Sequence, residues 1–321
     1  MLKIQKRDEY MLKKMAEYGV LNNKTINRMY GNMSQYPIRR RKRLSEEKYI
    51  IKNNVYSRLG IKGKEYLVEE LGFDEKDIRE IVRKKYTHIR IGKIAEILTA
   101  IEDIFETYPS WKIKNSASIN ERKDKYYGKI ISRHNGKEFY IYNLGKITST
   151  KFVNKAIFLK KKYMDNIRDE ILSKEYIDRV IILAEDRSTM DLYNRTLVSL
   201  NLKEQIMVPW IAAGFSLIKS IGCIDIDQKV VSYLYDDFYE GEWAYADYST
   251  EDGQVVVLAA NDAEKIVRLK HLEIANRYNK TKFMPIVICL ESQYRKFKKE
   301  FGNMEIKTVP DSIIKIPISN N

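Results

Sequence analysis

The sequence predicts a mixed α+β protein, in which an N-terminal winged helix-turn-helix precedes one or two small α/β domains. Helical periodicity followed by a hairpin fills the first 60 residues. Five consecutive basic residues, 39–43, lie inside that pattern. Two X-Gly turns between β-forming runs mark the second half. The expected domains are a winged helix (1–72), a helical connector (73–110), an α/β domain (111–215) and a second α/β domain (216–321).

Two helices are expected first. Residues 7–18 carry apolar side chains at helical spacing, and Gly19 is positioned to end that helix. Asn23 is the expected N-cap of a second helix over residues 24–30, which Gly31 breaks. The pattern so far is that of a small helical core.

A third helix is expected to begin at Ser34 or Gln35, since Pro37 is tolerated only in a first turn. Ile38 and Leu44 are expected to face the core, which leaves the basic run facing outward. This places the basic run on the helix that helix-turn-helix proteins insert into the major groove.

The wing is expected next, as a hairpin of residues 49–51 and 55–59 about a polar turn. Arginine and lysine side chains on such elements contact phosphates and guanine edges. The residues expected to contact DNA are Ser34, Gln35, Tyr36, Arg39, Arg40, Arg41, Lys42, Arg43, Lys52, Asn53, Asn54, Tyr56 and Arg58.

The net charge is concentrated in the same region. Residues 1–70 hold 17 basic and 8 acidic side chains, a net charge of +9 out of +14 for all 321 residues. Such a concentration favours binding to phosphates, because neutralised phosphates release counterions.

The remaining chain indicates one unit present twice. A longer amphipathic helix is expected over residues 86–106, with Phe105 facing inward, and the polar stretch 108–125 is the expected boundary. Beyond it, a hairpin, a helix, a strand and a helix occur around Asn135-Gly136 and again around Asp252-Gly253. This order predicts an α/β module with a small mixed sheet, and its recurrence predicts a structural repeat.

Three of these parts together resemble the replication-relaxation family of plasmid and mobile-element proteins. They are the winged helix with the basic run 39–44, the helix that starts at Thr87 with the sequence THIRIG, and the hairpin–helix–strand unit. The resemblance covers roughly residues 5–215. It implies a domain similar to restriction-endonuclease folds and an association with plasmid replication and DNA relaxation.

The nuclease-like comparison can be tested on residues. That chemistry needs an acid at the first hairpin, then an acid and usually a lysine on the next strand, to hold Mg²⁺ and activate water. In the first copy Asn143 stands where an acid is expected, and Glu138 is not well placed. In the second copy only a shifted set of Asp247, Asp262 and Lys265 is available. The expectation is therefore a nuclease-like scaffold without the complete set, used for binding or dimerisation, with no cofactor unless a Mg²⁺ nuclease is present.

Other site classes have little support. The three histidines, His88, His134 and His271, are far apart in sequence, which argues against a relaxase with a histidine-bound metal. Cys223 and Cys289 lie in apolar stretches, and two buried thiols fit a cytoplasmic protein better than a disulfide framework. No apolar run approaches the ~18 residues of a membrane span, and no secretory signal is apparent.

Residues 233–264 hold nine acidic side chains, no lysine or arginine, and several interleaved aromatic residues. This segment is either an exposed loop and strand, or a contact surface for a basic partner. A second protomer or a plasmid-encoded protein would fit, and a Mg²⁺ site is a third interpretation.

The sequence therefore predicts a cytoplasmic, sequence-specific double-stranded DNA-binding protein of a plasmid or mobile element, acting in replication, transfer (conjugation) or their regulation. Winged helices often bind paired half-sites as dimers, which the sequence permits. Two alternatives stay open: a Mg²⁺-dependent nuclease or relaxase on the C-terminal α/β domains, and a transcriptional regulator of its own operon.

Overall fold

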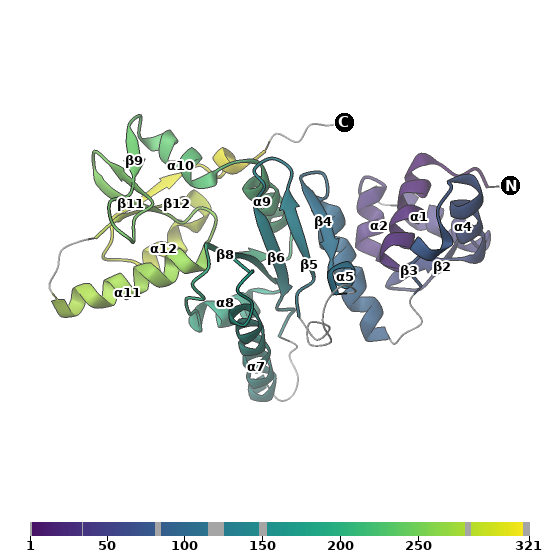
Figure 1. The fold of residues 1–321 in the computed structure, drawn as a ribbon, viewed down its shortest axis with the longest axis horizontal. Coiled ribbons are helices and arrows are strands. Elements are labelled where there is room, and N and C mark those ends of the chain that lie inside the picture. Colours follow the sequence, from purple (N-terminus) through teal and green to yellow (C-terminus); the bar gives the residue numbers. More distant parts are fainter. Residues whose placement is uncertain are drawn as a thin grey trace. The chain divides into compact units, whose positions relative to one another are not determined.

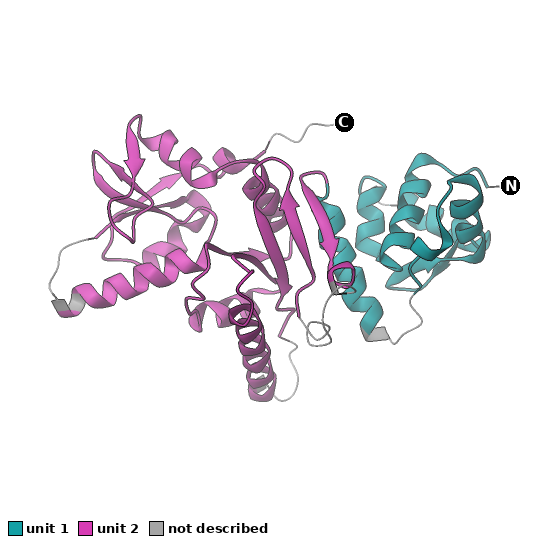
Figure 2. Ribbon diagram, viewed as in Figure 1, with its two compact units in different colours: residues 1–102 teal, residues 103–321 magenta. Residues whose placement is uncertain are grey.

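The chain is a mixed α+β protein. A computed structural model describes residues 2–33, 35–80, 85–114, 125–147, 153–279 and 284–316. The chain divides into two compact units, Met1–Glu102 and Asp103–Asn321 (Figure 2). This boundary differs from those expected at residues 72, 110 and 215, because the helix assigned to a connector packs with the N-terminal elements. Over the described ranges, no helix has both the length and the apolar character that crossing a bilayer requires.

Unit 1 is built from helices around a three-stranded antiparallel sheet of order β1-β3-β2 (Figure 1). Its elements are α1 (Lys6–Tyr18), β1 (Leu21–Asn22), α2 (Asn23–Met29), α3 (Tyr36–Glu46), β2 (Ile50–Lys52), β3 (Tyr56–Leu59), α4 (Ile61–Glu65), the π-turn η1 (Tyr66–Glu70), the 3-10 turn η2 (Glu75–Asp77) and α5 (Lys85–Ile101).

The core of unit 1 follows the expected periodicity. Met11, Leu12 and Met15 of α1 are fully buried, and α1 ends where Gly19 adopts a left-handed conformation with φ 77°. The cap of α2 is Asn22, whose side chain accepts a hydrogen bond from the Thr25 amide at 2.8 Å, so the expected cap at Asn23 is wrong by one residue.

Unit 2 contains two five-stranded sheets. The first is formed by β4 (Phe105–Pro109), β5 (Gly128–Ser132), β6 (Glu138–Asn143), β7 (Arg179–Ala184) and β8 (Glu204–Pro209), with helices α6 (Ser110–Lys114), α7 (Val153–Leu172), α8 (Arg187–Arg195) and α9 (Ala212–Cys223). The second is formed by β9 (Phe238–Glu240), β10 (Tyr248–Thr250), β11 (Gly253–Val257), β12 (Ile286–Leu290) and β13 (Ile306–Val309), with α10 (Ile226–Leu234), α11 (Ala263–Asn279), α12 (Tyr294–Glu300) and the 3-10 turns η4 (Glu291–Gln293) and η5 (Asp311–Ile314).

The two sheets share one topology (Figure 1). In the first, β4, β5 and β6 form an antiparallel meander, and β7 and β8 then add in parallel. In the second, β9, β10 and β11 form the meander, and β12 and β13 add in parallel. In both, a long helix connects the last meander strand to the first parallel strand, as a parallel crossover requires.

Strands β6, β7 and β12 are buried along almost their whole length, as expected for strands covered on both faces, which explains their nearly continuous apolar sequences. Met164 and Ile167 of α7 and Tyr193 of α8 pack with Tyr142 and Ile182 of the first sheet. The second sheet has a corresponding apolar layer, formed by Val256, Leu258, Ile266, Leu269, Val287, Cys289, Phe297, Phe301 and Met304.

The expected helix over 86–106 is too long. Helix α5 ends at Ile101, and Phe105 begins strand β4, which pairs in register with Ser132 of β5. Phe105 is buried as expected, but in a sheet, because the apolar spacing after Ile101 suits a strand as well as a helix. The expected boundary at 108–125 therefore begins inside a strand, and residues 115–124 lie outside the described residues.

Candidate functional sites

The basic run of α3 is divided between two faces of the helix. Arg39, Lys42 and Arg43 are exposed, whereas Arg40 and Arg41 are each only 7% exposed. The expectation that the whole run faces outward is wrong for these two arginines. Ile38, expected in the core, is 54% exposed, because Arg40 and Arg41 take the inward positions beside Leu44.

Arg40 is paired with a fully buried carboxylate. Its Nε lies 3.0 Å from both oxygens of Asp8, and its Nη2 donates to Asp8 and, at 2.6 Å, to the Lys3 carbonyl. The Tyr30 hydroxyl also donates to Asp8. The bond to Asp8 raises the pKa of Arg40, and burial followed by the same carboxylate raises the pKa of Tyr30. Arg40 therefore anchors α3 to α1.

Arg41 has a similar structural role with a weaker partner. Its Nη1 donates to the Asn23 side-chain oxygen at the start of α2, and burial lowers the pKa of the guanidinium. Together, the two inward arginines fix α3 against α1 and α2. The exposed stripe of Arg39, Lys42 and Arg43 is therefore held on a helix whose opposite face is tied down.

The hairpin presents most of its expected contact residues to solvent. Lys52, Asn53, Asn54 and Arg58 are exposed. Tyr56 is half-buried, since its ring lies 4.8 Å from that of His88 and its hydroxyl is 2.9 Å from His88 Nδ1. Tyr56 therefore ties the hairpin to α5, which differs from the DNA contact expected of it.

The residues at the start of α3 differ in exposure and in hydrogen bonding. Gln35 is exposed and accepts a hydrogen bond from Arg39 Nη2 at 3.0 Å. Tyr36 is 37% exposed and donates to Gln5 Oε1 at 2.7 Å. Ser34 lies outside the described residues.

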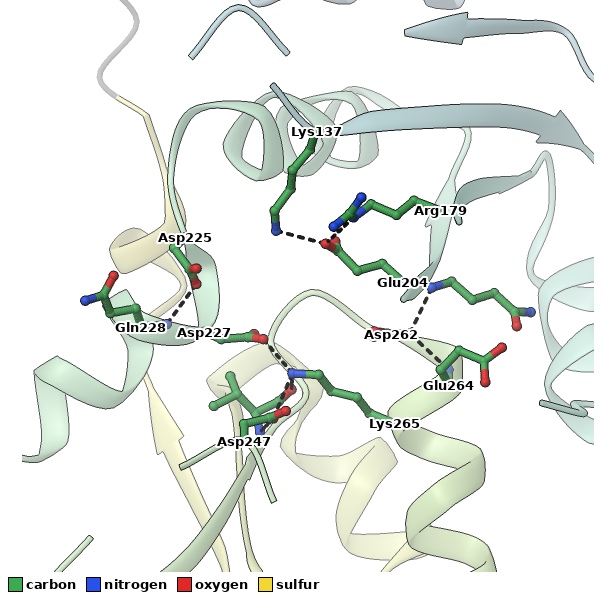
Figure 3. Close-up of polar contacts among 12 residues, drawn as sticks. Lys137, Arg179, Glu204, Asp225, Asp227, Gln228, Asp247, Asp262, Glu264 and Lys265 are labelled. Atoms are coloured by element: carbon green, nitrogen blue, oxygen red, sulfur yellow. Dashed lines mark hydrogen bonds and ion pairs between the residues drawn. The ribbon is translucent and has the colours of Figure 1, made fainter. Parts of the chain in front are cut away.

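A second candidate site lies in unit 2, in a pocket of about 350 Å³ beside the second sheet. Lys265, near the start of α11, points between two carboxylates (Figure 3). Its Nζ lies 2.5 Å from Asp227 Oδ2, 2.7 Å from Asp247 Oδ2 and 3.3 Å from the Val257 carbonyl oxygen. Three oxygens from α10, from the segment before β10 and from the end of β11 thus converge on one ammonium group.

The electrostatics of this cluster are tightly coupled. Burial alone would lower the pKa of Lys265, but Asp227 and Asp247 outweigh it and hold the pKa well above the ordinary value. Burial raises the pKa of Asp227 despite the nearby Lys265 charge. Asp247 is oriented independently, because its Oδ2 also accepts the Val257 amide at 2.8 Å.

Asp262 belongs to the same pocket but has a different role. Its carboxylate accepts hydrogen bonds from the amides of Gln205 at 3.0 Å and Glu264 at 2.9 Å (Figure 3). Burial raises the pKa of Asp262 to about 6. The expected set of Asp247, Asp262 and Lys265 is thus brought together only in part, and Asp227 takes the place assigned to Asp262.

The sequence did not predict Asp227 as a site residue. It lies in the first turn of α10, two residues after Asp225, which caps that helix by accepting the Gln228 amide at 3.0 Å. In the sequence this pair has the appearance of an ordinary helix start. Among the described residues, no group of three or more His, Cys, Asp or Glu side chains is arranged to hold a metal ion. The cluster contains two carboxylates and a backbone oxygen.

The acidic aromatic segment 233–264 is only partly a surface. Tyr233, Tyr239 and Tyr245 are 55%, 73% and 43% exposed. Its last acids are buried, and Glu264 accepts the Leu200 amide at 2.7 Å and the Ser199 hydroxyl at 2.6 Å. Of the two thiols, Cys289 is buried and Cys223 only half-buried, which corrects the expectation of two buried cysteines.

Comparison with known proteins yields no match to a family model, a curated protein or a solved structure.

Proposed function

We propose that this protein binds double-stranded DNA sequence-specifically through unit 1, acting as a winged helix in the cytoplasm. The observation that carries the proposal is the exposed stripe of Arg39, Lys42 and Arg43 on a helix whose opposite face is anchored by Arg40 and Arg41. A rigid helix with basic residues on its free face suits the major groove, where arginine and lysine contact guanine edges and phosphates.

The hairpin β2–β3 supports the same proposal. Lys52 and Arg58 are exposed on it, and it follows α3 directly in the chain, which is where a winged helix would have its wing. The resemblance to the replication-relaxation family extends the proposal to a plasmid or mobile element, with a role in replication, transfer or their regulation. Protection of DNA upstream of its own gene in a footprinting experiment would favour the alternative that the protein regulates its own operon.

The test is a gel shift of the full chain on fragments tiled across the DNA flanking its gene, at about 150 mM salt, where the purely electrostatic contribution is suppressed. The variant Arg39→Gln/Lys42→Gln should lose roughly tenfold or more in affinity for DNA. The slope of log affinity against log salt concentration should become shallower by about two units, one for each charge removed. The matched control Lys13→Gln/Lys76→Gln removes the same charge from exposed positions outside α3 and the hairpin. Equal losses in both variants would contradict the recognition-helix assignment.

A second candidate function, a metal-dependent nuclease in unit 2, is favoured by the convergence of Asp227, Asp247 and the Val257 carbonyl on one cation. The Lys265 ammonium stands in for a cation at that point, and carboxylate and carbonyl oxygens are the ligands that Mg²⁺ takes in proteins. Mg²⁺ held by these oxygens would supply Lewis-acid activation of water at a phosphodiester. Asp247 would be the best-positioned ligand, because the Val257 amide fixes its orientation.

Nicking of supercoiled plasmid with and without Mg²⁺ tests this candidate. Asp247→Ala should abolish nicking, while Asp236→Asn, an exposed acid of the same segment, should leave it unchanged. A readout besides activity comes from Lys265→Gln. If these oxygens form a cation site, Mg²⁺ should raise the thermal unfolding temperature of this variant more than that of the parent protein, because the competing ammonium is gone. Equal shifts would count against a cation site.

A further inference from the structure

A large groove in unit 2 is used by neither proposed site. It has a volume of about 1000 Å³ and runs between the ends of β7 and β8, helix α8 and helix α12. Its walls bring together Trp210, Met190, Arg195, Arg295, Lys296 and Lys299. The volume is at the upper end of the range for ligand pockets, so the groove can hold much more than a single ion.

The acidic side chains of this groove are already engaged. Asp186 caps α8 by accepting the Thr189 amide at 2.6 Å, and Glu300 is paired with Lys270 at 2.6 Å. Glu185 accepts a hydrogen bond from Asn143 at 2.8 Å, and Asp191 lies 3.8 Å from Arg187. The lining as a whole holds six basic and four acidic side chains, so its net charge is +2.

Three of those basic residues are not neutralised by an ion pair. Arg195, Arg295 and Lys299 are exposed to the groove, and none makes an ion pair with a residue that the structure describes. Arg295 and Lys299 are one helical turn apart on α12, so both project from the same side of that helix. Arg195 ends α8 on the opposite wall.

Lys296 adds a second and independent indication of an anionic ligand. It is half-buried, and its Nζ donates to the Asn261 side-chain oxygen at 2.6 Å and lies 4.7 Å from the centre of the Phe297 ring. Neither partner is an anion, and within the described chain no carboxylate lies at ion-pair distance. Burial lowers the pKa of Lys296, and the charges of Glu300 and Asp191 offset this lowering only in part. A bound anion in direct contact with the ammonium would compensate the cost of its burial more fully.

The groove also contains an aromatic and apolar floor. Trp210 packs edge-on against Tyr127 and Phe215, with ring centroids 6.3 and 5.8 Å away, so its indole is held in place. Ile211 beside it is 56% exposed, and Met190 lies on the same lining. Fixed aromatic rings beside basic side chains are what proteins use to stack unpaired bases while holding the phosphates between them.

We propose that this groove binds single-stranded nucleic acid, with phosphates on Arg195, Arg295 and Lys299 and a base against Trp210. Duplex DNA is a poorer fit, because paired and stacked bases do not offer their faces to an indole. The proposal goes beyond double-strand recognition by unit 1, since it uses different residues in a different unit. A protein with both surfaces would bind duplex DNA through one unit and single-stranded nucleic acid through the other.

The test is fluorescence anisotropy of a labelled oligothymidylate of about ten nucleotides, a length typical of single-strand sites, titrated with the full chain. Arg295→Gln/Lys299→Gln should weaken binding roughly tenfold, with a reduced salt dependence. The matched control Lys298→Gln/Lys229→Gln, which removes the same charge from α12 and α10 outside the groove, should stay within about twofold. Indole fluorescence should be quenched on binding, and Trp210→Phe should remove that quenching.

Several results would overturn the proposal. They are unchanged affinity in Arg295→Gln/Lys299→Gln, equally tight binding of a duplex of the same length, displacement by millimolar inorganic phosphate, or quenching that survives Trp210→Phe. The unit 1 variant Arg39→Gln/Lys42→Gln separates the two proposals. It should keep single-strand binding while losing the specific duplex shift, and loss of single-strand binding in it would assign that activity to unit 1.

Discussion

The pair of Asp8 and Arg40 gives the sharpest prediction about which basic residues of α3 are structural. In Asp8→Asn the carboxylate is replaced by a neutral amide of the same shape, and the Arg40 guanidinium keeps its charge. Because Asp8 is fully buried and Arg40 is 7% exposed, water cannot replace the lost partner. The change therefore leaves the buried Arg40 charge without its carboxylate partner.

The magnitude follows from the contacts. Asp8 accepts the Gln5 amide at 2.8 Å, the Tyr30 hydroxyl and the Arg40 guanidinium, so one substitution weakens the N-terminal cap of α1 and the attachment of α3 together. Breaking one partner of a buried pair costs about 3–5 kcal/mol. That corresponds to roughly two to four powers of ten in the opening equilibrium of unit 1.

Native-state hydrogen exchange read by mass spectrometry is the appropriate assay. Trp111, Trp210 and Trp243, which are all the tryptophans of the chain, lie in unit 2, so indole fluorescence reports that unit alone and serves as an internal control. Amides of α1 and α3 should lose protection in Asp8→Asn, while the urea midpoint read by fluorescence stays unchanged.

Two further variants sharpen the result. Arg39→Gln, on the exposed face of the same helix, should change protection by less than about 0.5 kcal/mol. Asp8→Leu/Arg40→Met should recover most of the loss, because an apolar pair of similar volume can replace a buried ion pair. A loss below about 1 kcal/mol in Asp8→Asn would refute the claim that this pair holds α3 in place. Substituting Arg39, Arg40 and Arg43 together would accordingly combine loss of DNA contacts with unfolding.

Three other outcomes are expected. Gly214→Ala should destabilise unit 2 by roughly 1–3 kcal/mol or more in urea unfolding followed by fluorescence, since a Cβ there would lie 2.0 Å from the Pro209 carbonyl oxygen. An unchanged urea midpoint would show that α9 can move to make room for the methyl group. Asn22→Ala should cost unit 1 about 1–2 kcal/mol or more by hydrogen exchange, because it removes the cap of α2 and the hydrogen bonds that Asn22 Nδ2 donates to the Gly92 carbonyl and to Glu96; unchanged protection of α2 would contradict this role. Asp262 has a pKa of about 6 in the folded protein and about 4 in the unfolded chain, so the folded state holds this proton more tightly. The stability of unit 2 should therefore fall by about 3 kcal/mol as the pH rises from about 4 to about 6, and Asp262→Asn should flatten this dependence.

Local pattern predicted the local structure of this chain well. Periodicity located α1, and turn residues located the hairpins β5–β6 and β10–β11 with the helices that follow them, because each of these signals depends on neighbouring residues. Strand β4 was mistaken for the end of a helix, because its pairing partner β5 lies beyond a segment of the chain with no strand signal. Strand β8 was missed in the same way, since only its pairing with β7 distinguishes it from an apolar loop.

The sites were harder to predict because their partners are distant in sequence. Arg40 faces inward only because Asp8, 32 residues earlier, is buried beside it. Asp227 joins Lys265 from 38 residues away, and helix α10 brings it there. A sequence shows the charge of a side chain, but its counter-ion belongs to the tertiary structure.

The counter-ion therefore separates structural cations from candidate binding cations in this chain. Arg40 and Lys265 are buried and paired with carboxylates, so the charge of each is already neutralised within the protein. The nuclease candidate would require a metal cation to displace the Lys265 ammonium from its carboxylates. Lys296 is half-buried and contacts an amide oxygen and an aromatic ring, and no carboxylate of the described chain lies at ion-pair distance from it, so its charge is available to a ligand. Arg39 is the solvent-exposed case, with one hydrogen bond to Gln35. Substitution of a paired cation should mainly lower stability, and substitution of an unpaired cation should mainly weaken ligand binding. Measuring the unfolding free energy and the nucleic-acid affinity of each variant therefore distinguishes the two roles without knowledge of the natural ligand.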